Sequence, residues 1–153
     1  MVVDADGINA LQGHIHILDE APGLRVLTPH EGEFSRLAEG WQEKGRMQAA
    51  LDFARSHRCV LLLKGHRTVI AAPDGRAMVN TTGNSGMAKG GSGDVLSGLI
   101  ASLMAQGAQA FDAAVMGAWI AGKAADFTAR RLNPYTMTPS DTVEDFAQVF
   151  NML

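Results

Sequence analysis

A glycine-rich stretch that runs into an apolar helix pattern, residues 80–98, constrains this chain more than any other feature. The glycines are followed directly by Asp94. Large apolar residues then recur at helical spacing: Val95, Leu96, Leu99, Ile100, Leu103 and Met104. We therefore predict a loop that feeds the N-terminus of a buried helix. The unpaired amides and the dipole of such a terminus favour phosphate or another anion.

Asp94 is the candidate catalytic group of this stretch. Glycines let the backbone approach phosphate oxygens, and amides neutralise the charge that develops during phosphoryl transfer. A carboxylate beside them can accept the proton of an attacking hydroxyl. The alternative is that Asp94 only stabilises the first turn of its helix, by about 0.3–1 kcal/mol. The stretch lacks the Lys-Ser/Thr ending of a P-loop and the spacing of a dinucleotide fingerprint, so neither motif is predicted.

The rest of the sequence predicts an α/β fold with a mostly parallel sheet. Strands are expected over residues 1–4, 25–29 and 59–63, and the last is an apolar run typical of a strand covered on both faces. Residues 68–72 and 77–80 flank a Pro-Asp-Gly turn and predict a hairpin at one edge of the sheet. Further helices are expected over residues 6–11, 30–37, 45–57, 111–132 and 141–150.

Local signals suggest where these helices begin and end. Asp6 is a candidate N-cap, and Gly107 suits a helix C-terminus. Ser140 is expected to cap the last helix, with Glu144 near the reciprocal position of a capping box. In the helix over residues 45–57 we expect Met47 to point inward.

Composition excludes several classes of partner. The chain has 153 residues, a length that suits one domain, and a net charge of −3, which argues against a broad nucleic-acid surface. Cys59 is the single cysteine, so no intrachain disulfide can form and a reducing, cytoplasmic setting is expected. No apolar stretch reaches membrane-spanning length, so we expect no membrane partner.

Four strings, in this order, resemble the ADP/ATP-dependent NAD(P)H-hydrate dehydratase family of the ribokinase-like superfamily. They are residues 4–9 (DADGIN), 28–33 (TPHEGE), 63–69 (LKGHRTV) and 84–98 (NSGMAKGGSGDVLSG). The resemblance covers essentially the whole chain. Its Gly-Met-Ala insertion is typical of the dehydratases, whereas sugar and vitamin kinases usually carry a shorter Gly-Ala-Gly-Asp. The resemblance implies a three-layer α/β/α fold.

The resemblance also implies a reaction. ADP or ATP would phosphorylate the ring hydroxyl of hydrated NADH or NADPH, phosphate would leave, and the double bond would return. Asp94 would be the base and a substrate contact, and the amides of Gly91 to Gly93 would form the anion hole. His30 and Asn84 match substrate-binding positions.

The nucleotide and its metal have their own implied positions. The nucleotide-binding residues would be Lys64, Gly65, His66, Arg67, Thr68 and Gly93. Glu33 stands where kinases of the superfamily place an acid near Mg²⁺. Lys89, inside the glycine-rich loop, either adds a phosphate contact or is solvated.

Catalytic domains of this family are longer and begin with a Gly-rich segment and several βα units that this sequence lacks. We therefore expect one partial domain over residues 1–153, the C-terminal half of such a catalytic domain. Apolar surface left by the missing half predicts homo-oligomers. An epimerase domain, fused or separate, stays open as a partner. Two alternatives for the function remain: a small-molecule kinase acting on a hydroxymethyl vitamin precursor or a sugar, and a catalytically silent module that binds nucleotide or self-associates.

Overall fold

The computed structural model describes residues 1–20 and 23–153, and in this part of the chain five strands form one sheet in the order β1-β2-β3-β4-β5. The strands are β1 (Val2–Val3), β2 (Val26–Leu27), β3 (Val60–Leu63), β4 (Val69–Ala71) and β5 (Ala77–Val79). The first three run parallel, and β4 and β5 add as an antiparallel hairpin. The prediction of a mostly parallel sheet with an edge hairpin is confirmed.

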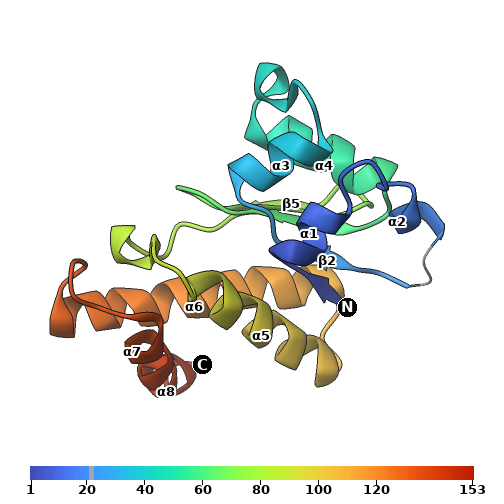
Figure 1. The fold of residues 1–153 in the computed structure, drawn as a ribbon. Coiled ribbons are helices and arrows are strands. Elements are labelled where there is room, and N and C mark those ends of the chain that lie inside the picture. The colour runs from blue at the N-terminus through green and yellow to red at the C-terminus, as the bar shows by residue number, and fades with distance from the viewer. Residues whose placement is uncertain (21–22) are drawn as a thin grey trace.

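Helices cover both faces of this sheet (Figure 1). On one face lie α3 (Glu31–Leu37) and α4 (Arg46–Ser56), and on the other lie α5 (Ser92–Ala105) and α6 (Ala110–Leu132). Successive side chains of β3 point to opposite faces of the sheet. Leu61 belongs to the same apolar cluster as Phe34, and Leu62 belongs to a second cluster with Ile100. The predicted three-layer arrangement is therefore confirmed.

Shorter helices complete the described chain. They are α1 (Asp6–Ala10), α2 (Ile17–Glu20), η1 (Trp41–Lys44), η2 (Ser85–Met87), α7 (Pro139–Glu144) and α8 (Phe146–Phe150). The last two pack against the C-terminal part of α6 (Figure 1). None of the helices described is both long and apolar enough to cross a membrane.

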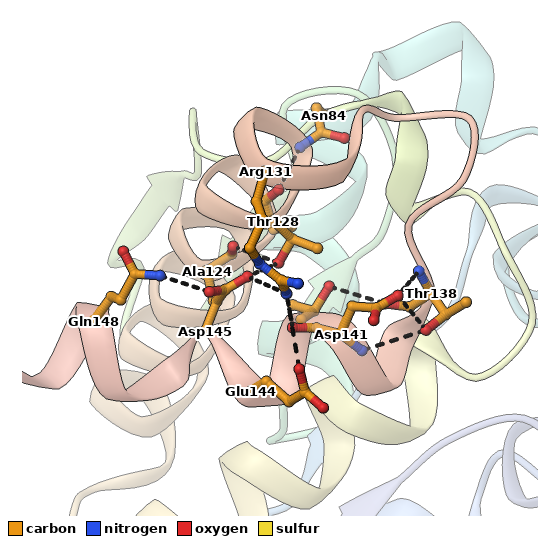
Figure 2. Close-up of polar contacts among 11 residues, drawn as sticks. Asn84, Ala124, Thr128, Arg131, Thr138, Asp141, Glu144, Asp145 and Gln148 are labelled. Carbon is orange, nitrogen blue, oxygen red and sulfur yellow. Dashed lines mark hydrogen bonds and ion pairs between the residues drawn. The ribbon is translucent and has the colours of Figure 1, made fainter.

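A buried carboxylate fixes α7 and α8 to α6 (Figure 2). Asp145 lies between the two short helices, and its Oδ2 accepts hydrogen bonds from Thr128 Oγ1 at 2.7 Å and Arg131 Nη2 at 3.0 Å. Its Oδ1 accepts one from Gln148 Nε2 at 2.6 Å. Burial alone would raise the pKa of Asp145, but these hydrogen bonds and the Arg131 charge outweigh it and lower the pKa.

Two predicted helix caps are wrong. Asp6 is the first residue of α1, and Ala5 precedes it as N-cap at φ 46°, because the chain turns sharply after β1. At α7, Thr138 is the N-cap and Asp141 its partner in the capping box, so the helix starts before Ser140. Proline is favoured at the first helical position, which accounts for the earlier start at Pro139. The expected last helix over residues 141–150 is divided at Asp145.

Two predictions of burial are also wrong. Met47 is 37% exposed, whereas Ala49, two residues further along α4, is buried in the hydrophobic core. The predicted buried helix α5 buries only Ile100 fully; its other large apolar residues are half-buried, because β1 and α6 cover only part of the helix surface. The expected glycine at the end of α5 is present, since Gly107 follows the C-cap Gln106 in the left-handed region, at φ 100°.

Candidate active site

The ends of the parallel strands and the start of α5 meet at one edge of the sheet. Asp4 follows β1, and Lys64 follows β3. His30 lies shortly after β2 and pairs with Lys64 through an isolated β-bridge. α/β sheets bind ligands at the carboxyl ends of their strands, so this edge is the expected place for a site.

A cavity of about 1050 Å³ opens at this edge. Every predicted nucleotide-binding residue lines it: Lys64, Gly65, His66, Arg67, Thr68 and Gly93. His30 and Asn84 also line it, and its remaining walls come from residues 80–83, from the glycine-rich loop and from α6. A volume of this size accommodates a ligand of nucleotide dimensions.

The ammonium group of Lys64 is fixed beside α5. Its Nζ lies 2.9 Å from Oδ1 of Asp4, whose Oδ2 accepts a hydrogen bond from Ser97 Oγ at 2.8 Å. Burial opposes ionisation of Asp4, but the bonds from Lys64 and Ser97 prevail and lower its pKa. A Cβ on Gly93 would lie 3.3 Å from Asp4 Oδ2 and 3.4 Å from Lys64 Nζ, so glycine permits this close approach.

The N-terminus of α5, next to Lys64, has unbonded amides. Gly91 is the N-cap at φ 92°, a conformation that favours glycine, and no side chain caps the helix. Among residues 1–20 and 23–153, no acceptor is bonded to the amides of Gly93 and Asp94. With Lys64 nearby, this terminus has the donors and the positive potential that bind a phosphate group.

Asp94, the predicted base, does not line the cavity. It is exposed on the first turn of α5, and Gly91 is likewise outside the cavity wall. Of the predicted catalytic residues, only Gly93 is brought together with the nucleotide-binding segment. Asp94 therefore lies next to the cavity wall that Ser92 and Gly93 form, but not in it.

Glu33 lies away from the cavity wall. It is 6% exposed, and its Oε2 accepts a hydrogen bond from His30 N at 2.8 Å while His30 Nδ1 accepts one from Glu33 N at 3.1 Å. The two residues thus form the capping box of α3. The described residues contain no group of three or more His, Cys, Asp or Glu side chains that could hold a metal ion.

Asn84 lines the cavity, but its side-chain amide holds the loop. Its Oδ1 accepts from Gly86 N at 2.9 Å, and its Nδ2 donates to Ala125 O at 3.0 Å and Asp126 Oδ1 at 3.2 Å. Its place against α6 is visible in Figure 2. A substrate contact by Asn84 would have to share these atoms.

Sequence reasoning missed Arg46, and neither role that it offered for Lys89 describes the contacts which that residue makes. Arg46, at the start of α4, donates from Nη2 to Leu63 O at 3.0 Å and from Nη1 to His66 O, which braces the nucleotide-binding segment. Lys89 is partly exposed and lines the cavity, but its Nζ donates to Tyr135 O at 2.9 Å and Met137 O at 2.6 Å, so its ammonium group is bonded to the backbone. Both contacts join distant parts of the chain, and a local pattern carries no signal for them.

Comparison with known proteins assigns the chain. A family model described as NAD(P)H-hydrate dehydratase matches residues 1–147. The chain belongs to the NAD(P)H-hydrate dehydratase family. Among its relatives, the bifunctional NAD(P)H-hydrate repair enzyme Nnr of Moorella thermoacetica is 45% identical over 99% of this chain and 29% of its own length. The ADP-dependent (S)-NAD(P)H-hydrate dehydratase of Neisseria meningitidis is 41% identical over 82% of this chain and 44% of its own. The chain thus spans less than half the length of these two relatives.

Solved structures agree with this assignment. The Bacillus subtilis ADP/ATP-dependent NAD(P)H-hydrate dehydratase, crystallised with ATP and Mg²⁺ and soaked with CoA, superposes with a TM-score of 0.86 at 30% identity. The match covers 99% of this family member and 55% of the B. subtilis chain. A hydroxyethylthiazole kinase of Pyrococcus horikoshii matches with a TM-score of 0.74 at 17% identity, which shows a shared fold alone.

Proposed function

We propose that this chain forms part of a single ribokinase-like catalytic domain and supplies the nucleotide-binding side of an ADP- or ATP-dependent NAD(P)H-hydrate dehydratase. The observation that carries the proposal is the cavity in which Lys64, residues 65–68 and Gly93 lie together. The names of the relatives support the choice of substrate, hydrated NADH or NADPH, over the alcohols that small-molecule kinases use.

Each candidate residue has a role in this proposal. Lys64 and the α5 amides neutralise the phosphate oxygens of ADP or ATP. Asp94 accepts the proton of the ring hydroxyl as the hydroxyl oxygen bonds to the terminal phosphorus, and the phosphoanhydride bond breaks to release AMP from ADP or ADP from ATP. The phosphorylated oxygen then leaves as phosphate while the adjacent ring carbon loses a proton to water, which restores the ring double bond. His30, whose ring edge is exposed at the cavity, contacts the hydrated dinucleotide, and Asn84 holds the loop next to it.

Glu33 does not fit as a metal ligand, because its carboxylate is buried and already bonded to the backbone of His30. We infer that Mg²⁺ arrives with the nucleotide, held by phosphate oxygens and water, as is usual for this ion. No step of the proposed reaction is assigned to a metal-binding side chain.

The reaction itself tests this proposal. The purified protein is mixed with hydrated NADPH and ADP, and in parallel with ATP, and the dihydronicotinamide absorbance is recorded. Nucleotide-dependent recovery of that absorbance is expected. Phosphorylation of a thiazole or pyrimidine alcohol with no recovery would contradict the dehydratase and favour a kinase.

A second candidate, nucleotide binding without turnover, is favoured by one observation. Asp94 is exposed and outside the cavity, so the proposed base does not face the space in which the nucleotide is proposed to bind. A calorimetric titration that shows ADP binding, together with an assay that shows no recovery of absorbance, would support this candidate.

Partners and location follow as further proposals. The half-buried apolar residues of α5 favour self-association, and a monodisperse monomer in light scattering would contradict it. The bifunctional relatives favour an epimerase domain that acts with this one, fused or separate. Cys59 is buried and free, and burial raises its pKa to about 12, which is compatible with the proposed cytoplasmic location.

A further inference from the structure

Lys89 lies in the loop before α5, and its ammonium group is surrounded by backbone carbonyls. Its Nζ donates to Met137 O at 2.6 Å and Tyr135 O at 2.9 Å, and lies 3.5 Å from Pro134 O. A lysine ammonium has three donor hydrogens, so these carbonyls can use all of them. The ammonium group of Lys89 is therefore hydrogen-bonded to the protein's own backbone.

The carbonyls belong to a segment with its own internal bonds, residues 133–138. Asn133 ends α6 at φ 78°, and its Oδ1 accepts from Tyr135 N at 2.9 Å and Thr136 N at 3.2 Å. Thr136 Oγ1 donates to Leu132 O at 2.7 Å. These hydrogen bonds hold the segment at the end of α6, and none of them involves Lys89.

The glycine-rich loop packs against the same region on both sides of Lys89. A Cβ on Gly86 would lie 2.3 Å from Sδ of the buried Met137 and 2.8 Å from Pro134 O. A Cβ on Gly91 would lie 3.3 Å from Cγ of Pro139. The two glycines therefore allow the loop to lie directly on residues 134–139, with Lys89 as the charged contact between them.

The backbone of Lys89 continues this support into α5. Its carbonyl accepts a hydrogen bond from Ser92 N, the first residue of the helix, at 3.3 Å. Gly93, the next residue, lines the cavity. Contacts thus run without a break from the end of α6, through Lys89, to the amides expected to hold phosphate.

We propose that Lys89 is a positioning residue, which fixes the phosphate-binding end of α5 by donating hydrogen bonds to the carbonyls of residues 134, 135 and 137. The identity of the phosphate as part of a nucleotide rests on the proposed function. The fixing of the loop does not, because it follows from contacts within the chain.

The test uses two variants and one control. Lys89→Ala removes the side chain, Lys89→Met keeps most of the stem without the charge, and Lys44→Ala removes an exposed lysine that pairs with Asp52 across a solvent-exposed contact. In hydrogen exchange without ligand, both Lys89 variants should exchange the hydrogen-bonded amides of residues 86–89 and of Ser92 about tenfold or more faster, as expected when charge-assisted hydrogen bonds are lost. The amides of β3 should be unaffected, and Lys44→Ala should match the wild type.

Chemical rescue separates the charge from the packing. In Lys89→Ala, ammonium chloride should restore protection of the amides of residues 86–89 and Ser92, because NH₄⁺ can donate to the vacated carbonyls, whereas tetramethylammonium chloride at the same concentration cannot. Unchanged protection in both variants would overturn the role of the ammonium group. So would a loss of protection in Lys89→Ala that neither salt restores, or that both salts restore equally.

An ADP titration completes the experiment. The Kd of both Lys89 variants should rise about tenfold or more, as the lost charge-assisted bonds predict. A loosened loop with unchanged ADP affinity would overturn the link to the phosphate site. If the wild type binds no ADP, the proposed function fails, and the exchange measurements still decide whether Lys89 fixes the loop.

Discussion

The ammonium group of Lys64 lies 2.9 Å from the carboxylate of Asp4, which joins the ends of β3 and β1 directly beside α5. Both side chains are largely shielded from solvent. The pair therefore fixes a positive charge at the point where the amides of Gly93 and Asp94 lack acceptors. The pair thus holds Lys64, one of the residues that line the cavity, in place.

Replacing Asp4 by asparagine should lower the free energy of unfolding at neutral pH and make that free energy depend less on pH in the acidic range. Because the native pKa of Asp4 is lowered, its contribution is present above the pKa of the unfolded chain and is lost as pH falls through the native pKa. Near pH 7 we expect Asp4→Asn to cost about 1–3 kcal/mol, the usual value for a hydrogen bond to a charged group. Urea unfolding at neutral and acidic pH measures the loss of stability and its pH dependence. A difference in unfolding free energy between wild type and variant that stays constant as pH falls would refute a stabilising role of the Asp4 charge.

Two glycines on α5 give a matched pair of substitutions. Gly93→Ala puts a methyl group against Asp4 and Lys64 and should abolish or strongly weaken ADP binding, whereas Gly98→Ala meets nothing within 4 Å. Alanine is favoured over glycine in a helix by about 1 kcal/mol, so Gly98→Ala should raise the unfolding free energy and leave ADP affinity unchanged. Calorimetric titration and thermal melts compare them; equal ADP affinities in the two variants would contradict the site.

The network in Figure 2 predicts an unequal effect for two neighbouring acids. Asp145→Asn removes the buried charge that Arg131 and Thr128 contact, and should cost about 3 kcal/mol. Glu144→Gln removes a carboxylate that is 73% exposed and 3.9 Å from Arg131, and should change stability by about 0.5 kcal/mol or less. Denaturant unfolding of both variants checks this, and similar losses would show that burial does not govern the network.

Acid should also act through Asp145. Its native pKa is lowered, so its contribution to stability is present at neutral pH and is lost as pH falls through that pKa. In Asp145→Asn the C-terminal helices should therefore lose this acid-dependent loosening. Exchange of the α8 amides as a function of pH reports it, and an unchanged pH profile in the variant would speak against it.

Strong local patterns were enough to predict most of the fold. The apolar run of β3, the Pro-Asp-Gly turn of the hairpin and the small residues of α6 each specify their element within a few residues. The cap at Ala5 escaped prediction because a sharp turn after β1 sets where α1 begins. The cap at Thr138 has a local signal that was overlooked, with Pro139 at the first helical position and Asp141 as its capping-box partner.

The candidate site was predictable in its members but not in its geometry. The resemblance indicated Lys64 to Thr68 and Gly93, and the cavity contains them. The bonds of Lys89 to carbonyls near residue 135, and of Lys64 to Asp4, connect positions 45 or more residues apart. Glu33 could have been interpreted differently, since its spacing from His30 is that of a capping box.

Titration of the wild-type protein and of Gly93→Ala with ADP by calorimetry measures whether this cavity binds a nucleotide. We expect saturable binding of one ADP per chain to the wild type, and binding that is abolished or strongly weakened in Gly93→Ala. No heat of binding with the wild type, or equal affinity in the variant, would contradict the assignment of this cavity to a nucleotide.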